Sequence, residues 1–327
     1  MLLYKTKAQK ALVFCFKTES NPLSFSITIL GSSGAMPAYG RHPSAQLVEI
    51  QNRHFLVDCG EAVQMQLMRF QANYLRINHI FISHLHGDHY LGLMGLVFTM
   101  HMHKRETDLH IYSHKGLDEI ITTHLRYSQS VPSYKIFFHP LEKDAREIIF
   151  EDNAITVETI PLKHKLTCSG FLFREKPKPR RIDKATLPEG LLINQIAGLK
   201  KGEDVRDGDG NVLYKNEALT LSPRKSRSYA YCSDTAFKED MINQIQSIDL
   251  LYHEATFTTE DEAKATETKH STAAQAATIA KRATVTKLLV GHFSARYKDL
   301  NPILAEAKAI FPNTALALEG EKFTLQE

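Results

Sequence analysis

The sequence predicts a mixed α/β protein in which two β-sheets pack together and helices cover their outer faces. Segments with strand-like and helix-like patterns alternate or come in pairs along the chain, as they do in layered α/β folds. A chain of 327 residues with 43% hydrophobic residues has enough apolar surface for a large packed core. Histidines and carboxylates follow several strand-like segments, which indicates a site at one edge of a sheet.

Composition narrows the class of protein. The net charge of +3 permits an anionic partner without requiring one, and no apolar run is long enough to span a membrane. The cysteines are scattered without a CxxC pair, which predicts buried free thiols in a reducing cytoplasm. They are Cys15, Cys59, Cys168 and Cys232. Residues 1–24 have some signal-peptide character, but lysines interrupt the apolar patch and no cleavage site follows, so we expect an N-terminal extension that forms an arm or a first strand.

The first predicted elements are a strand, a tight turn, a hairpin and a helix. Residues 25–30 alternate apolar and polar side chains, and the glycine-rich turn at 31–34 lets backbone pass close to other loops. Residues 45–50 and 54–57 form the hairpin, and a helix follows over 62–70. Asp58 is by default a helix N-cap, and the alternative is that it orients a metal-bound histidine.

The central motif is a short apolar strand followed by a crowded group of candidate metal ligands. Residues 80–82 are apolar β-formers, and residues 91–98 have helical spacing. Between them, an H-x-H-x-D-H pattern places four ligands on one loop: His84, His86, Asp88 and His89. Imidazole and carboxylate suit zinc, and manganese or iron less exclusively. Because one loop supplies more ligands than one open zinc position needs, we expect two metals and further ligands elsewhere.

Strands and helices continue after this motif. We expect a helix at 116–127 and strands at 110–112, 134–140, 147–150, 154–161 and 170–173. The histidines without ligand-like surroundings are expected to be surface or structural residues for the most part. They are His42, His54, His79, His101, His103, His110, His114, His124 and His139.

Later strand ends also carry imidazole or carboxylate groups. His164 follows the strand that ends at 161, Asp234 follows a strand at 228–232, and His292 follows a strand at 287–290. His253 and Glu254 come directly after a strand at 249–252. Loops at one edge of a sheet face one crevice, so we expect these groups to meet the H-x-H-x-D-H loop there.

The segment between His164 and Asp234 differs in composition from the rest. Residues 174–184 are basic and proline-rich, 187–199 are apolar, and the following residues are charged and turn-rich, which predicts a projecting arm. Its basic side chains could grip a phosphate backbone. They are Lys178, Arg180, Arg181, Lys200 and Lys201. Residues 207–211 form a hairpin turn rather than a calcium loop, because no glutamate occupies the twelfth position.

The C-terminal part begins with an alanine-rich helix over 271–284, for which Ser271 is the expected N-cap. His270 lies directly before it, where the helix dipole disfavours the imidazolium. A proton-donating His270 therefore needs a carboxylate partner, and Glu254 is the candidate. A final helix over 302–311 and a closing hairpin over 315–325 complete the chain.

Taken together, these motifs resemble the metallo-β-lactamase fold family and, within it, the short-form ribonuclease Z group that processes transfer-RNA 3′ ends. HLHGDH is common to the whole fold family. More specific are LGSSGAMP, VDCGEAVQMQL, YCSDT, HEATF, HST and GHFSARY, which extend over nearly the whole chain from Phe25. The resemblance implies a four-layer αββα sandwich over 25–327, with an inserted transfer-RNA-binding arm within 174–227.

The resemblance also implies a reaction. Two Zn²⁺ per subunit, with Mn²⁺ or Fe²⁺ as alternatives, would activate water to cut precursor tRNA and leave a 3′-hydroxyl. The ligands of one ion would be His84, His86 and His164, those of the other Asp88, His89 and His292, with Asp234 bridging. Asp88 would also be the general base, and His270, positioned by Glu254, the general acid. The expected enzyme is a cytoplasmic homodimer in which one subunit's arm serves the other's site.

Two departures from the family pattern leave points open. Many relatives have P-x-K-x-R-N in the early loop, where this chain has Pro37, Tyr39, Arg41 and His42. Many also have a Gly-Pro pair in the arm, which residues 187–192 lack. Discrimination of CCA ends and the boundaries of the arm therefore need not follow those relatives.

Two rival hypotheses use the same residues. A hydrolase of small anionic esters, of the arylsulfatase or cyclic-nucleotide phosphodiesterase type, would keep the two metals without needing the arm. An RNA-binding protein with a structural metal would not need the pair Glu254 and His270.

Overall fold

Two seven-stranded sheets form the centre of the protein, of which the computed structural model describes residues 24–326. The first sheet has the strand order β18-β1-β2-β3-β4-β5-β6, and the second β17-β16-β15-β14-β9-β8-β7. The strands of the first sheet are β1 (Phe25–Gly31), β2 (Ala45–Ile50), β3 (Arg53–Cys59), β4 (Ile77–Phe81), β5 (Leu109–Ser113), β6 (Ile136–Pro140) and β18 (Lys322–Thr324). Those of the second are β7 (Ile148–Glu151), β8 (Ile155–Pro161), β9 (Ser169–Glu175), β14 (Ser228–Cys232), β15 (Leu250–Glu254), β16 (Lys287–Gly291) and β17 (Thr314–Leu316).

The inner faces of the two sheets meet in an aromatic core. Phe55 and Phe81 of the first sheet each lie with their ring centroid 5.7 Å from that of Phe173 in the second sheet. All three side chains are fully buried, and burying a side chain of this size contributes about 1.5–3 kcal/mol. This contact surface holds the two halves of the sandwich together.

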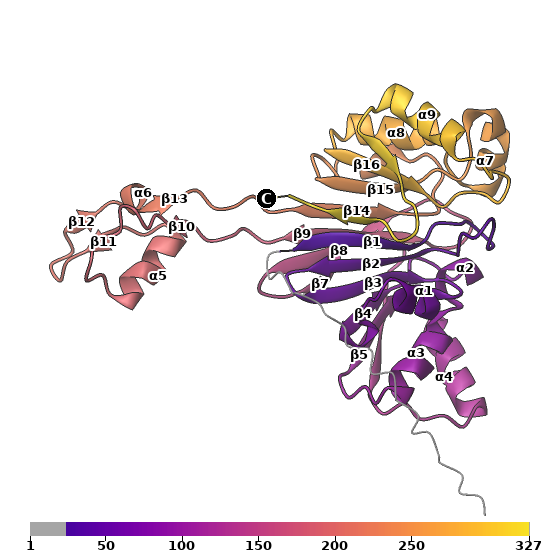
Figure 1. Ribbon diagram of the computed structural model, residues 1–327, viewed down its shortest axis with the longest axis horizontal. Coiled ribbons are helices and arrows are strands. Elements are labelled where there is room, and N and C mark those ends of the chain that lie inside the picture. The colour runs from indigo at the N-terminus through magenta and orange to yellow at the C-terminus, as the bar shows by residue number, and fades with distance from the viewer. Residues whose placement is uncertain (1–23, 327) are drawn as a thin grey trace, which may run out of the picture.

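Helices cover the outer face of each sheet, which gives the predicted αββα layering (Figure 1). Over the first sheet lie α1 (Val63–Arg69), α3 (Leu93–Met102) and α4 (Leu117–Tyr127), and over the second α8 (Ala273–Arg282) and α9 (Asn301–Ile310). The N-cap of α8 is Thr272, whose hydroxyl accepts from Gln275 N. The expected cap Ser271 is wrong, because its hydroxyl donates instead to the carbonyl of Thr235.

Each sheet contains a parallel half. Strands β3 to β6 are parallel to one another, and so are β14 to β17. The carboxyl ends of parallel strands lie together at one edge, which is where open α/β sheets place their sites. The H-x-H-x-D-H loop, Asp234 and His292 follow β4, β14 and β16 at these ends, whereas His164 follows β8.

The two C-terminal strands belong to different sheets. Strand β17 pairs in parallel with β16, whereas β18 pairs antiparallel with β1. The expected closing hairpin is therefore wrong: the last residues link the two sheets at their edges. Local sequence shows two short strands and a turn, but the pairing partners lie far away in the chain.

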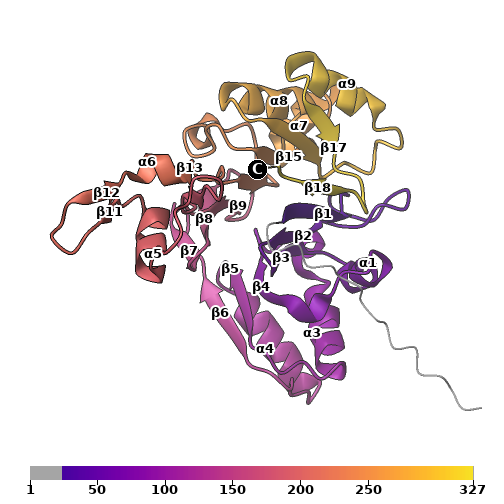
Figure 2. The same cartoon turned by 60° about the vertical axis from the view of Figure 1, so that its left-hand side comes forward.

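A separate arm leaves the second sheet between β9 and β14 and projects away from the sandwich (Figures 1 and 2). It contains β10 (Arg181–Ile182), α5 (Ile193–Lys201), β11 (Val205–Arg206), β12 (Val212–Tyr214), α6 (Asn216–Leu219) and β13 (Thr220–Leu221). Its small core is formed by Leu199, Val205 and Leu219. The predicted turn at 207–211 connects β11 to β12, with Asp207 accepting from the backbone of Asn211.

The root of the arm is held by a buried ion pair. Arg227 donates from Nε and Nη2 to the two carboxylate oxygens of Glu175 at 2.9 and 2.6 Å, and Gln51 donates to the same carboxylate. Burial opposes the charge of Glu175, but the hydrogen bonds from Arg227 prevail and lower its pKa to about 2. The arm therefore begins and ends at a fixed point of the second sheet.

Some expectations concern residues outside 24–326. The N-terminal extension and Cys15 lie there, so their predictions stay untested. Cys59, Cys168 and Cys232 are buried free thiols, as expected. Within residues 24–326, no helix combines the length and the apolar character that crossing a bilayer requires.

Candidate metal centre

The H-x-H-x-D-H loop connects β4 to the short helix α2 (Gly87–Tyr90). His84 and His89 are fully buried, while His86 and Asp88 are partly exposed to a crevice of about 600 Å³. His164, Asp234 and His292, which come from the second sheet, line the same crevice. The structure thus brings together side chains from both halves of the sandwich, as the sequence predicted.

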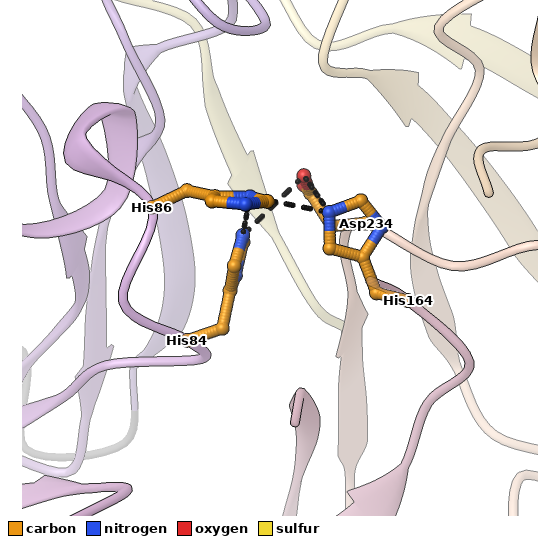
Figure 3. A group of neighbouring side chains, drawn as sticks. All are labelled: His84, His86, His164 and Asp234. Atoms are coloured by element: carbon orange, nitrogen blue, oxygen red, sulfur yellow. Dashed lines mark hydrogen bonds and ion pairs between the residues drawn. The ribbon is translucent and has the colours of Figure 1, made fainter. Parts of the chain in front are cut away.

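One group of candidate ligands combines three histidines and Asp234 (Figure 3). His86 Nδ1 lies 2.9 Å from His84 Nε2 and 3.2 Å from His164 Nε2. Asp234 Oδ2 lies 3.6 Å from His84 Nε2 and 3.7 Å from His164 Nε2. Burial lowers the pKa of His84 well below its usual range, so the ring is in the neutral form that binds metals.

A second group lies on the other side of Asp234. Asp88 Oδ2 is 3.3 Å from His89 Nε2 and 3.5 Å from His292 Nε2. Asp234 Oδ1 is 3.3 Å from His89 Nε2 and 3.1 Å from His292 Nε2. The two carboxylate oxygens of Asp234 therefore face different groups, which is the geometry of a bridging ligand.

The two groups fit divalent cations. In each of them the candidate ligand atoms lie within 4.8 Å of one another. The Nε2 atoms of His89 and His292 are buried, and although carboxylate oxygens lie 3.1–3.5 Å from them, neither atom makes a hydrogen bond. An unsatisfied buried polar atom costs about 1–3 kcal/mol, and a coordinated cation would remove that cost. We call the two groups together the His/Asp cluster.

Asp58 orients a side chain of the cluster through hydrogen bonds. Its carboxylate accepts from Ser83 N at 2.8 Å, from Ser83 Oγ at 2.9 Å and from Tyr231 OH at 2.6 Å. It also lies 2.7 Å from His89 Nδ1, which leaves His89 Nε2 to face the cluster. The default expectation of a helix N-cap is wrong, because α1 begins after Ala62 without a side-chain cap. The alternative, a partner that orients a histidine, matches the contacts.

Backbone conformation directs these side chains inward. Asp58, Asp234 and His292 have left-handed φ values of 55°, 57° and 59°. Non-glycine residues rarely adopt this conformation, which costs about 1–3 kcal/mol and concentrates at functional sites. Each strand end therefore turns sharply. Asp234 and His292 point into the crevice, and Asp58 points toward His89.

The glycine-rich turn passes against the cluster, as expected. A Cβ on Gly34 would lie 2.8 Å from His292 Cε1, so only glycine fits there without displacing the ring. The next residue, Ala35, donates its N–H to Asp88 Oδ2 at 2.7 Å. The turn thus fixes the position of Asp88 and limits the position of His292.

Glu254 and His270 form the predicted pair at the rim. His270 Nδ1 lies 2.9 Å from Glu254 Oε1, and its ring centroid is 5.3 Å from that of His292 and 4.9 Å from that of His164. Burial disfavours the imidazolium, but the charge of Glu254 and its hydrogen bond prevail and raise the pKa of His270 to about 9. His270 therefore carries a proton at neutral pH, beside the cluster.

Thr256 is a site residue that sequence reasoning did not single out. Its hydroxyl donates to Glu254 Oε2 at 2.5 Å and lies 2.9 Å from His292 Nδ1, which leaves His292 Nε2 to face Asp234. It therefore connects the pair Glu254–His270 to the His/Asp cluster. The sequence does contain a signal for Thr256, because this residue belongs to the HEATF motif and lies two residues after Glu254.

The remaining histidines and the arm residues lie apart from the crevice. Among residues 24–326, neither His253 nor the histidines expected to be structural join a metal-binding group. His253 Nδ1 bonds to the carbonyl of Glu254 instead. In the arm, a separate cavity of about 620 Å³ is lined by Lys178, Arg180, Arg181 and Lys200, and Lys201 is exposed.

Comparison with known proteins places this fold and cluster in a class. A model described as a beta-lactamase superfamily domain matches residues 203–293, and a model described as anti-Pycsar protein Apyc1 matches residues 25–177. Human tRNase Z, short form, has a TM-score of 0.67 at 25% identity, over 91% of this chain and 98% of that one. The metallo-β-lactamase fold protein YhfI from Bacillus subtilis has a TM-score of 0.65 at 20% identity, over 92% and 99%. The chain is thus a metallo-β-lactamase fold protein with a cluster suited to divalent metal.

Full-length relatives narrow this class. Ribonuclease Z from Cytophaga hutchinsonii is 47% identical over 305 residues, covering 93% of this chain and 97% of the relative. Ribonuclease Z from Bacteroides thetaiotaomicron is 44% identical over 302 residues, covering 92% and 95%. The chain belongs to the ribonuclease Z family.

Proposed function

We propose that this protein is an endoribonuclease that removes the 3′ trailer from precursor tRNA and leaves a 3′-hydroxyl. The observation that carries the proposal is the protonated His270 held by Glu254 beside the His/Asp cluster. A hydrolytic cut needs a nucleophile on one side of the phosphorus and a proton for the leaving oxygen on the other. Membership of the ribonuclease Z family supports RNA as the substrate.

The proposed cofactors are two Zn²⁺ per subunit, with Mn²⁺ or Fe²⁺ as alternatives. Mixed histidine and carboxylate donors support this choice. His84, His86 and His164 would hold one ion, and Asp88, His89 and His292 the other, with Asp234 between them. Bound divalent ions supply an activated water and neutralise phosphate charge.

In the proposed reaction, one side chain accepts a proton and another donates one. Asp88 accepts the proton of the attacking water, from a position fixed by the N–H of Ala35. His270 donates its proton to the leaving 3′ oxygen, and Glu254 stabilises the imidazolium until that step. Thr256 and Asp58 keep His292 and His89 in the orientation that the cluster needs.

The arm, residues 174–227, is proposed to bind tRNA in a cytoplasmic homodimer. Its basic residues Lys178, Arg180, Arg181, Lys200 and Lys201 support contact with a phosphate backbone. The arm leaves from the start of β14, whereas Asp234 follows the end of the same strand. Because arm and cluster lie at opposite ends of β14, delivery of the arm to a partner's site is the simpler geometry (Figure 1).

Cleavage of one trailer-bearing precursor, with and without chelator, tests the function. We expect a single cut at the start of the trailer, loss of cutting with chelator and recovery with Zn²⁺ or Mn²⁺. Intact precursor with metal-loaded protein would reject the proposal.

Two variants separate the rival hypotheses. Glu175 N donates to the carbonyl of Arg227 at 2.9 Å, so a short glycine-serine linker can replace residues 177–225. We expect this variant to lose precursor cleavage and to keep turnover of a small phosphodiester. If the deletion changes neither rate, the arm is not needed for cleavage, which would favour a small-ester enzyme. His270→Ala should abolish cleavage while RNA binding persists, and unchanged cleavage would remove His270 as the acid.

A further inference from the structure

A cavity adjoins the metal crevice on the side of His164, and half of the residues that line it are lysines. Its volume is about 370 Å³. The lysines that line it come from four separate loops, and we call it the lysine groove. They are Lys143, Lys163, Lys165, Lys238 and Lys269. Nothing in the proposed chemistry uses these side chains, apart from the position of Lys269 next to His270.

The groove continues directly from the crevice. His164 and Lys165 line both cavities, so a chain bound at the cluster can pass from one into the other without crossing the rim. Two contacts fix the inner end of the groove. His164 Nδ1 lies 3.0 Å from the carbonyl of Lys269, and Lys269 Nζ donates to the carbonyl of His164 at 3.3 Å.

Charge in the groove is unbalanced. Asp144 is the one carboxylate among its lining residues, and within residues 24–326 none of the five lysines forms an ion pair with a carboxylate. Lys238 Nζ donates to the carbonyl of Pro161 at 2.9 Å, which keeps its charge near the groove. A concave surface with one sign of charge concentrates oppositely charged groups.

The rim of the crevice opposite the lysine groove differs from the groove in charge. Its lining there consists of Ala35, Met36, Pro37 and Pro43, together with Glu61. These residues offer no positive charge to a phosphate. Of the two directions in which a strand can leave the cluster, the groove is therefore the one that favours a polyanion.

We propose that the lysine groove binds the RNA phosphates next to the scissile bond. This inference rests on the proposed function and adds a subsite for the strand, apart from the arm. Exposed lysines interact with phosphates as point charges, so the groove contributes affinity and register rather than base recognition. The strand can be the trailer or the mature 3′ end, which share this chemistry.

A double variant tests the groove. We expect Lys143→Ala/Lys163→Ala to raise KM for a trailer-bearing precursor about tenfold, and to reduce the slope of log affinity against log salt by about 0.7 for each lost contact. Lys143→Arg/Lys163→Arg keeps both charges and should restore both values. Lys281→Ala/Lys308→Ala, two exposed lysines at the far ends of α8 and α9, is the matched control.

Binding of two RNAs, mature tRNA and the trailer-bearing precursor, distinguishes whether the trailer or the mature 3′ end supplies the phosphates. If the groove holds the trailer, the double variant binds mature tRNA like the unaltered protein and loses affinity only for the precursor. If it holds the mature end, affinity for both falls. Equal KM and equal salt slope in the double variant and in the control would overturn the inference, even though precursor cleavage by the unaltered protein would still support the proposed function. Thermal melting of each variant confirms that it is folded.

Discussion

The proton on His270 depends on one neighbouring carboxylate. Burial alone would remove this proton at neutral pH, and Glu254 reverses the effect. Because the pKa of His270 is raised, its protonated form is present below about pH 9 and is lost as the pH rises through that value. The pair thus sets the alkaline limit of the proposed reaction.

Replacing Glu254 by glutamine should move this limit. Without the carboxylate charge, the pKa of His270 should fall to its ordinary value of about 6.5 or below. We expect Glu254→Gln to shift the alkaline limb of kcat/KM by at least about two pH units toward acid. A pH–rate profile measures the shift, with Glu267→Gln at an exposed position as control. An unmoved limb would mean that another group donates the proton.

Asp58 should control metal affinity without being in the crevice. Asparagine at this position keeps the shape but loses the charge that pairs with His89 Nδ1. Partners of this kind typically contribute about 10–100-fold to metal affinity. We expect a loss of that size in Asp58→Asn, measured by competition with a chelator. Glu49→Gln, which removes a surface pair with Lys322, should leave the affinity unchanged, and a similar affinity in both variants would contradict the role of Asp58.

Among the elements, the turn before β2 packs directly against the cluster. A methyl group on Gly34 would meet the ring of His292, while Gly208 in the arm has no neighbour within 4 Å. We expect Gly34→Ala to reduce bound metal and to lower kcat/KM at least about tenfold. Gly208→Ala should change neither value. Metal analysis and kinetics on both variants check this, and full metal occupancy in Gly34→Ala would contradict the contact.

The last strand should stabilise both sheets. Leu325, directly after β18, is 9% exposed and packs into the core between the sheets. We expect Leu325→Ala to lower the free energy of unfolding by about 2–3 kcal/mol, because a buried leucine leaves a cavity. Leu318→Ala, at a side chain that is 37% exposed, should cost less than about 1 kcal/mol. Urea unfolding compares the two, and equal losses would show that β18 adds little.

Elements with a local signal were predictable, and those without one were not. Strands β2 and β14 have the predicted bounds, because alternation or an apolar run marks them. Helix α7 (Glu262–Thr268) was missed, since its residues are mainly polar and show no apolar period. The pairing of β17 and β18 depends on distant strands, which a local pattern cannot report.

At the scale of the whole molecule, the site joins the two sheets. The H-x-H-x-D-H loop was predictable as a metal motif, and the positions of His164, Asp234 and His292 at strand ends made their convergence expected. The orienting role of Thr256 was not predicted, and that of Asp58 was only the alternative to a helix N-cap. Both roles depend on which atoms meet after folding, and the same residue types serve as caps and turns elsewhere.

The separation of arm and cluster along β14 predicts complementation between subunits. We expect Asp234→Asn and the arm-deleted variant to be inactive alone. Mixed and re-assembled, half of the proposed dimers would combine one intact cluster with the partner's arm, and activity should return to about a quarter of the unaltered level. Cleavage assays on the mixture measure this. An inactive mixture that contains mixed dimers would show that each arm serves its own subunit.

The placement of β18 beside β1 has a consequence for synthesis on the ribosome. Strand β1 is made long before its outer neighbour, which consists of residues 322–324. Until residues 322–324 are made, one border of the first sheet keeps free N–H and C=O groups, a surface prone to pairing with other chains. The nascent protein must therefore be protected along that border until residues 322–324 emerge.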